Sequence, residues 1–223
     1  MLEDIYMQEL KMKNHFPENT ETFFIEGPAG KLEMLSVKPE NFTSKKIAII
    51  CHPNPEQSGT MQNKVVTTLA KVFEQLGMAS LRFNFRGVGQ SEGSHGQTIG
   101  EADDLRAVVA WVKKVQPEWE IVLAGFSFGS YIAAVVANEI NPAYLISIAP
   151  PADRYDFNQL TNIRCPWWVV MGDADEIVSP AIVIEWAKHP PAPIHFLLLP
   201  VVSHFFHGHL IELRELLVAR LSP

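Results

Sequence analysis

A serine between two glycines is the feature of this sequence that most directly predicts chemistry. Ser127 is the centre of a Gly-x-Ser-x-Gly pattern at residues 125–129, which follows the apolar run 121–124 and precedes an Ala- and Val-rich segment. In this context the pattern predicts a sharp strand-to-helix turn that holds a nucleophilic serine above a sheet. The N–H of Phe128 would then begin a helix and stabilise an oxyanion. An ordinary glycine-rich turn is the competing interpretation, because short motifs also arise by chance.

Five histidines follow the serine, and their places along the chain separate them as candidate bases. His204 lies in the loop between the apolar run 194–199 and the last helical segment, from which a side chain can reach the serine at about 3 Å. His195 falls inside a strand pattern, and His189 precedes two prolines in a loop. We therefore predict His204 as the base, with His207 as the alternative.

The histidines near the C-terminus also suggest a metal site as an alternative. His204, His207 and His209 are close in sequence, but their spacing is not a standard zinc pattern and no cysteine or carboxylate lies among them. We therefore expect no metal and no other cofactor.

The elements that would position these residues alternate between strands and helices. Short β-branched runs predict strands, and apolar residues at helical spacing predict helices between them. The expected strands are 23–26, 31–37, 47–51, 78–85, 121–124, 144–149, 167–171 and 194–199, and the expected helices are 61–76, 101–115, 128–139, 180–188 and 209–221. The first two strands form a hairpin, and the rest predict an α/β fold with a mostly parallel sheet of about seven or eight strands and helices on both faces.

The chain length is suited to one domain. A chain of 223 residues can bury one sizeable core but hardly two. We see no internal repeat or linker, so we predict a single domain over residues 21–223. Residues 1–20 are predicted to be an N-terminal appendage, partly helical or disordered.

Several short motifs occur in a fixed order along the chain. They are HPNP at 52–55, GTM at 59–61, LRFNFRGVGQS at 81–91, GFSFG at 125–129 and SHFFHG at 203–208. With these motifs the sequence resembles the α/β-hydrolase superfamily, most closely the small, capless bacterial hydrolases related to dienelactone hydrolases. The resemblance covers nearly the whole chain from about residue 23. It is specific for the fold and the catalytic machinery, and much less so for the substrate.

The resemblance also implies roles for residues on two loops. It places the second oxyanion N–H at Asn54, in the loop after the strand 47–51, which spacing alone could not choose from its neighbours. His52 beside it is expected to hold that loop by hydrogen bonds rather than to act as a base. Arg86 is expected to form a structural ion pair with Asp103 and Asp104.

The acid that orients the base is expected in the segment 171–178, after a predicted strand. Relatives carry Gly-x-x-Asp-x-x-Val there, and this resemblance selects Asp175. Asp173 would shape the turn and Glu176 would lie on the surface. Asp173 stays open as the acid, because the two aspartates are separated by a single residue.

The surroundings of the site are less defined by sequence. In this family a cap usually occupies the place of residues 150–166, which are too few here, so we expect no substantial cap. Four phenylalanines flank the site residues in sequence and suggest either an apolar acyl pocket or ordinary core packing. They are Phe126, Phe128, Phe205 and Phe206.

Composition limits the classes of partner. Lys plus Arg is 18 and Asp plus Glu is 25, so a net charge of −7 disfavours nucleic acid and anionic membranes. The first thirteen residues lack the apolar core of a secretory signal, and no run reaches the roughly 18 apolar residues of a membrane span. Cys51 and Cys165 are interpreted as reduced thiols. These features favour a cytoplasmic protein.

These observations predict a serine hydrolase that cleaves a small to medium ester or thioester through an acyl-enzyme. Ser127, His204 and Asp175 would form the triad, and Phe128 and Asn54 would supply the oxyanion N–H groups. The expected partner is a small-molecule acyl substrate, and a homodimer stays open. The alternatives are a serine peptidase acting on small peptides and a non-catalytic binding protein that keeps the fold.

Overall fold

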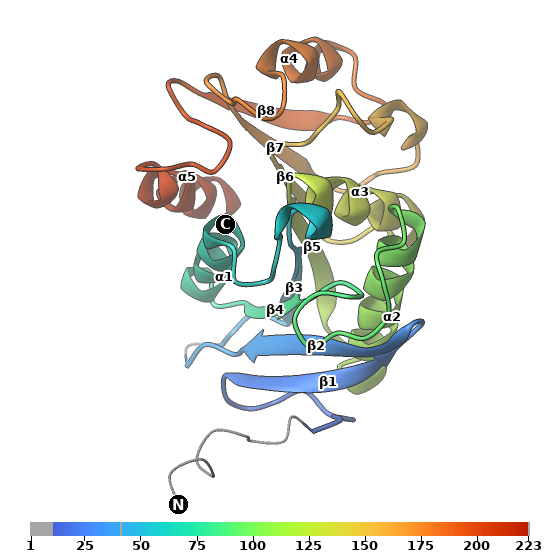
Figure 1. Ribbon diagram of the computed structural model, residues 1–223. Coiled ribbons are helices and arrows are strands. Elements are labelled where there is room, and N and C mark those ends of the chain that lie inside the picture. Colours follow the sequence, from blue (N-terminus) through green and yellow to red (C-terminus); the bar gives the residue numbers. More distant parts are fainter. Residues whose placement is uncertain (1–10, 41, 223) are drawn as a thin grey trace, which may run out of the picture.

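Eight strands form one sheet in the order β1-β2-β4-β3-β5-β6-β7-β8 (Figure 1). The computed structural model describes residues 11–40 and 42–222. Strands β1, β2 and β4 pair antiparallel, and every pairing from β4 to β8 is parallel. The strands are β1 (Glu21–Gly27), β2 (Gly30–Val37), β3 (Lys46–Cys51), β4 (Ala79–Phe83), β5 (Glu120–Phe126), β6 (Tyr144–Ile148), β7 (Trp167–Gly172) and β8 (Ile194–Leu199). The predicted mostly parallel sheet is confirmed.

Helices cover both faces of this sheet. Helices α1 and α5 pack together, and α2 packs against α3 on the opposite side (Figure 1). The helices are α1 (Lys64–Gln75), α2 (Ile99–Val115), α3 (Phe128–Ile140), α4 (Pro180–Lys188) and α5 (Leu210–Leu221), with short 3₁₀ turns η1 (Pro55–Gln57) and η2 (Phe157–Gln159). Between β6 and β7 the only such element is η2, so this connection, which the structure describes in full, forms no cap over the carboxyl ends of the strands. Among the described residues, no helix has the length and apolar character to cross a bilayer.

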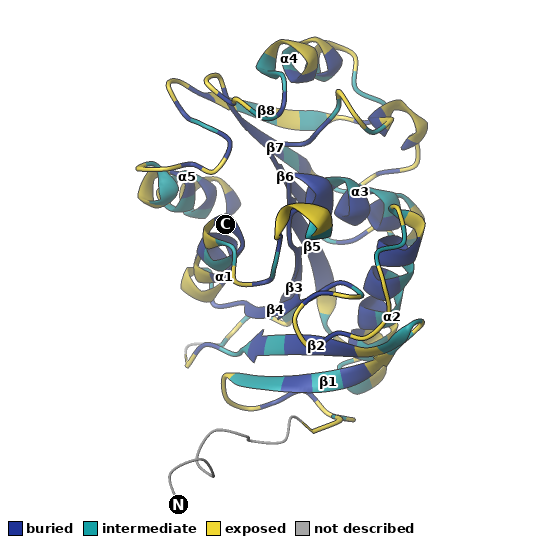
Figure 2. Ribbon diagram, viewed as in Figure 1, coloured by how far each residue is buried: buried dark blue, intermediate teal, exposed yellow. Residues whose placement is uncertain are grey.

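The middle of the sheet is the most buried part of the molecule (Figure 2). Nearly every residue of β3 and β5 is buried, as expected for parallel strands covered on both faces. At the edge, β8 has mostly half-buried or exposed residues. The buried central strands are therefore the ones that carry the loops with Asn54 and Ser127.

The structure describes the second half of the segment before β1, residues 11–20. Residues 11–20 are irregular chain with bends and one isolated bridge from Met12 to Phe24, and Lys13 N–H donates to Phe24 O at 3.1 Å. Phe16 is buried against Trp111 and Trp119, and Trp111 Nε1 donates to Lys13 O at 2.9 Å. These apolar contacts explain why this segment lies along the domain. Residues 1–10 lie outside the described residues.

Capping side chains account for two helix starts that differ from the sequence prediction. Helix α1 begins at Lys64 rather than 61, because Asn63 Oδ1 accepts the N–H of Val65 at 2.9 Å. Helix α2 begins at Ile99 rather than 101, and Glu101 Oε2 accepts the N–H of Thr98 at 2.9 Å. The caps satisfy backbone donors that the first helical turn leaves free.

Candidate active site

Ser127 occupies the sharp turn between β5 and α3. Its backbone has φ 51° and ψ −122°, an unfavourable conformation for a residue with a side chain, and its N–H donates to Ile148 O at 2.8 Å. The flanking glycines are required by close approach: a Cβ at Gly125 would overlap the carbonyl of Gly129, and a Cβ at Gly129 would overlap that of His52. The turn therefore has the geometry that holds a serine hydroxyl at a helix N-terminus.

The two predicted oxyanion donors lie at the ends of neighbouring strands. Cys51 pairs with Gly125 in the β3–β5 register, so Asn54 and Phe128, each three residues further on, leave the same edge of the sheet. Phe128 is the first residue of α3, where an N–H has no partner within the helix. Among the hydrogen bonds of the described residues, the N–H groups of Asn54 and Phe128 donate to no acceptor. Both are free to bind an oxyanion.

The loop that carries Asn54 is held by its own hydrogen bonds. Asn54 O accepts the N–H groups of Gln57 at 3.1 Å and Gly59 at 3.0 Å, and Asn54 Oδ1 accepts that of Glu56 at 2.9 Å. None of these bonds uses the backbone N–H of Asn54. The loop is thus held by hydrogen bonds that do not involve this N–H.

His204 and Asp175 meet above the ends of β7 and β8. His204 Nδ1 lies 2.7 Å from Asp175 Oδ2, and the two side chains are only 2% and 1% exposed. Asp175 Oδ1 accepts the N–H groups of Ile177 at 2.9 Å and Val178 at 2.8 Å, which orients the carboxylate. Such a pair fixes the ring and would stabilise the imidazolium that forms during proton transfer.

The neighbouring aspartate has a different place. Asp173 is exposed, and its Oδ1 accepts the N–H of Val201 at 2.6 Å. It therefore shapes the turn after β7, whereas Asp175 is the carboxylate that contacts His204.

Aromatic contacts place His204 beside the serine turn. Its ring centroid lies 4.9 Å from that of Phe126, the residue before Ser127, and 5.1 Å from that of Phe205. The hydrogen bonds of the described residues do not include one between His204 and the Ser127 hydroxyl. In a site without substrate this contact is commonly long and shortens when substrate binds.

Glu176 has a role that the sequence did not indicate. It was expected on the surface, and it is exposed, but its Oε2 accepts the backbone N–H of His204 at 3.0 Å. The partner lies 28 residues away in the chain, so no local pattern could have revealed it. This bond orients the backbone of the residue predicted as the base.

The other candidate histidines do not join His204. His195 stacks on Trp168 with ring centroids 4.2 Å apart, and His189 follows the last residue of α4. His207 is exposed, and His209 Nδ1 lies 2.8 Å from Glu212 Oε2. Within the part of the chain that the structure describes, no three His, Cys, Asp or Glu side chains are arranged as metal ligands.

His52 holds the loop after β3, as the sequence interpretation expected. Its Nε2 accepts the N–H of Phe85 at 3.0 Å, and its Nδ1 donates to Pro53 O at 2.7 Å. Burial lowers the pKa of His52 to about 4, so the ring is neutral at physiological pH. A neutral ring with both nitrogens engaged connects the β4 loop to the loop of Asn54.

The expected Arg86 ion pair is half correct. Arg86 contacts both carboxylate oxygens of the buried Asp104, and this hydrogen bonding raises the pKa of Arg86. Asp103 instead pairs with Arg106. The expectation for Asp103 was wrong because consecutive helix residues point about 100° apart, so only one of the two faces Arg86.

The four phenylalanines divide between core and surface. Phe126, Phe128 and Phe206 are buried, whereas Phe205 is 37% exposed. Core packing therefore accounts for Phe126 and Phe206, and Phe205 is the ring that remains open to solvent beside His204.

Comparison with known proteins agrees with this geometry. A profile of the family described as serine aminopeptidase, S33, matches residues 43–155, about half of the chain. The chain belongs to this α/β-hydrolase family. A relative of this α/β-hydrolase, an uncharacterised protein of Rickettsia prowazekii (strain Madrid E), is 36% identical over 163 residues, which cover 70% of this chain and 67% of the relative.

Solved structures extend the similarity to nearly the whole chain. An α/β serine hydrolase homologue from Coxiella burnetii has a TM-score of 0.90 and 47% identity, covering 93% of this chain and 100% of its own. A serine hydrolase without lid from Xanthomonas campestris has a TM-score of 0.84 and 42% identity, covering 94% and 98%. The predicted resemblance to capless α/β-hydrolases is confirmed, and family and fold support a hydrolase as the class of enzyme.

Proposed function

We propose that this α/β-hydrolase cleaves esters or thioesters of small to medium acyl groups through an acyl-enzyme on Ser127. The observation that carries the proposal is the buried hydrogen bond between His204 and Asp175, adjacent to the strained serine turn. A buried carboxylate–imidazole pair beside an elevated serine is the arrangement that activates a hydroxyl nucleophile.

In the first step, Ser127 Oγ attacks the substrate carbonyl carbon. His204 Nε2 takes the hydroxyl proton, while Asp175 holds the Nδ1–H and stabilises the positive ring. The N–H groups of Phe128 and Asn54 bind the oxyanion. Collapse of the tetrahedral intermediate breaks the bond to the alcohol or thiol, which leaves with the proton from His204.

In the second step, water replaces the leaving group. His204 takes a proton from the water as it attacks the acyl carbon, and then returns that proton to Ser127 Oγ as the carboxylic acid departs. Each step uses the same pair of oxyanion donors. Removing one such donor typically lowers the rate by about 10²–10³.

Labelling of the serine is the direct test. The folded protein is incubated with a fluorophosphonate, and its intact mass is compared with that of Ser127→Ala and His204→Ala. Ser94→Ala, at an exposed serine, is the matched control. We expect one adduct in the wild-type protein and the control, and none in the other two variants. No adduct on the folded wild-type protein contradicts the proposal and favours a binding protein that keeps the fold.

A substrate panel then separates esterase from peptidase. p-Nitrophenyl esters and acyl thioesters of graded length are compared with aminoacyl p-nitroanilides at equal enzyme concentration. We expect turnover of the esters or thioesters, with the highest kcat/KM at short to medium acyl length. Faster turnover of the anilides would identify a peptidase instead.

A further inference from the structure

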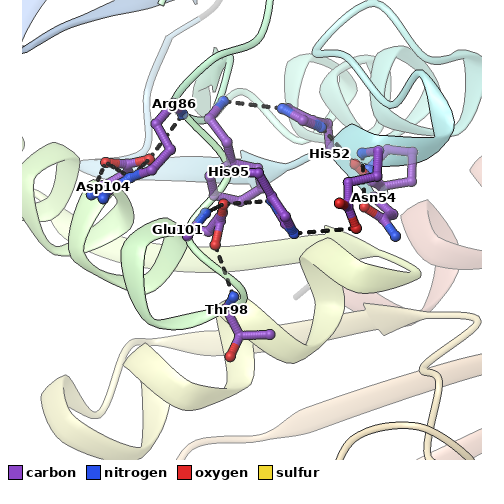
Figure 3. A network of polar contacts seen from close by, with 11 residues as sticks. His52, Asn54, Arg86, His95, Thr98, Glu101 and Asp104 are labelled. Carbon is purple, nitrogen blue, oxygen red and sulfur yellow. Dashed lines mark hydrogen bonds and ion pairs between the residues drawn. The ribbon is translucent and has the colours of Figure 1, made fainter. Parts of the chain in front are cut away.

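His95 lies between two carboxylates at the edge of the proposed oxyanion site (Figure 3). Its Nδ1 is 2.8 Å from Glu101 Oε1, and its Nε2 is 3.6 Å from Glu56 Oε2. Glu101 lies off the direction of a ring N–H, so the two groups are in close contact without a directed hydrogen bond at Nδ1. Neither the proposed triad nor the two oxyanion donors include any of these three residues.

Glu101 is a fixed anchor for this cluster. Its side chain is 0% exposed, and its two oxygens accept the N–H groups of Gly96 at 2.8 Å and Thr98 at 2.9 Å. A buried carboxylate with this many partners cannot move without leaving them unsatisfied. The Glu101 carboxylate is therefore fixed in place beside the His95 ring.

The backbone between His95 and Glu101 is strained. Gln97 has φ 52° and Thr98 has φ 80°, and positive values are rare for residues with a Cβ, above all for β-branched ones. Such conformations persist only where surrounding contacts hold them, and they concentrate at functional sites. Here they fold the segment back so that His95 and Glu101 face each other.

The other carboxylate belongs to the oxyanion loop. Glu56 is in η1, two residues after Asn54, and its N–H donates to Asn54 Oδ1 at 2.9 Å. The His95 ring centroid also lies 5.9 Å from that of Phe128, whose N–H is the other proposed donor. His95 thus lies against Glu56 of the Asn54 loop on one side and the ring of Phe128 on the other.

We propose that His95 is a positioning residue for this site: held by Glu101, it fastens η1 through Glu56 and so fixes the Asn54 N–H relative to that of Phe128. The inference rests on the proposed function, because it assigns Asn54 a role in catalysis. His95 acts through the loop and touches no reacting atom.

The charged groups and the solvent around the three residues limit how much the His95 contacts can contribute to kcat. Glu101 also faces Arg86, whose pKa it helps to raise, and Tyr155, whose pKa is raised by burial and by the charges of Glu101 and Glu56. Glu56 is 68% exposed, so water screens its attraction to His95. We therefore expect a loss of about threefold to fivefold in kcat without the Glu56 contact, and of about tenfold without His95, both below the loss of an oxyanion donor.

The test is a double-mutant cycle on the whole 223-residue chain. The variants are Glu56→Gln, His95→Gln and the double variant, with kcat and KM measured on a p-nitrophenyl ester and normalised to the sites labelled by fluorophosphonate. Glu118→Gln is the matched control, because it removes an exposed ion pair with Lys45 at the opposite end of the strands. Normalisation removes any loss that comes from unfolded protein.

We expect both single variants to lower kcat per labelled site with KM nearly unchanged. We expect kcat of the double variant to be no lower than that of His95→Gln. The control should stay within twofold of the wild type. Singles that also stay within twofold, or losses that multiply in the double variant, overturn it. A wild-type protein that neither labels nor turns over ester refutes the proposed function instead, so the two failures are distinguishable.

Discussion

Replacing Asp175 by asparagine should lower kcat far more than it lowers stability, for a reason visible in the hydrogen bonds. Asp175 Oδ1 accepts two backbone N–H groups, from Ile177 and Val178. An asparagine at this position keeps those bonds only with its carbonyl oxygen there, so its NH₂ group faces His204 Nδ1. The ring must then carry its proton on Nε2, and Nε2 can no longer accept the proton of Ser127.

The expected magnitude follows from this change of tautomer. The equivalent change in Ser-His-Asp proteases lowers kcat about 10⁴-fold, which corresponds to about 5 kcal/mol of transition-state stabilisation. The assay is the hydrolysis of a p-nitrophenyl ester at pH 7.5, with circular dichroism spectra to verify folding. We expect a loss of at least 10³-fold in kcat and an unchanged spectrum.

The matched control is Asp173→Asn, two residues earlier in the same turn. Asp173 bonds Val201 N–H, and an asparagine oxygen can keep this bond, so activity should stay within about threefold of the wild type. If Asp175→Asn retains more than a tenth of the activity, or if the two variants lose equal activity, the reasoning about His204 is wrong.

Two further predictions concern buried groups. The pKa of His52 is about 4 in the folded protein and near 6.5 in the unfolded chain, so the free energy of unfolding should fall as the pH is lowered from 6.5 to 4. Between pH 7 and pH 4, urea unfolding should show about 3 kcal/mol more loss of this free energy in the wild type than in His52→Gln. Equal losses would contradict the role of burial. Burial also raises the pKa of Cys165 to about 11 and that of Cys51 further, so Ellman's reagent at pH 8 should react slowly with the folded protein. After unfolding in guanidinium, both thiols should react rapidly. A rapidly reacting thiol in the folded protein would refute this.

The strand-turn-helix around Ser127 could be predicted because its signals are local. A buried apolar run, small residues at fixed positions and an immediate helix all occur within a few neighbouring residues, and the order of strands and helices follows from the same kind of pattern. The resemblance to α/β-hydrolases added the register of the loops, including the position of Asn54.

Contacts between distant segments could not be predicted in this way. Asp173 and Asp175 have the same local surroundings, and the direction of each side chain depends on the turn and on residues of the β8 loop. Glu176 meets a backbone N–H of that loop, which no periodicity reports. The choice between such neighbours is made by tertiary structure.

The cluster of His95 shows the same limit with one exception. Glu56 lies 39 residues before His95, so nothing local joins them. Thr98 and Glu101, however, have the Thr-x-x-Glu spacing of a capping box, and the backbone half of that motif is present, with Glu101 accepting the N–H of Thr98. This signal could have placed the start of α2 at Ile99 and Glu101 in its first turn.

The short connection between β6 and β7 affects how the acyl-enzyme would partition between acceptors. Where a lid closes over an acylated serine, water is excluded and a bound alcohol can compete for the acyl group. Here the only element in that connection is the 3₁₀ turn Phe157–Gln159, so the ester on Ser127 would be open to bulk water. Transfer to added alcohols should therefore be minor compared with hydrolysis, and release of the carboxylic acid would not wait for a domain to open.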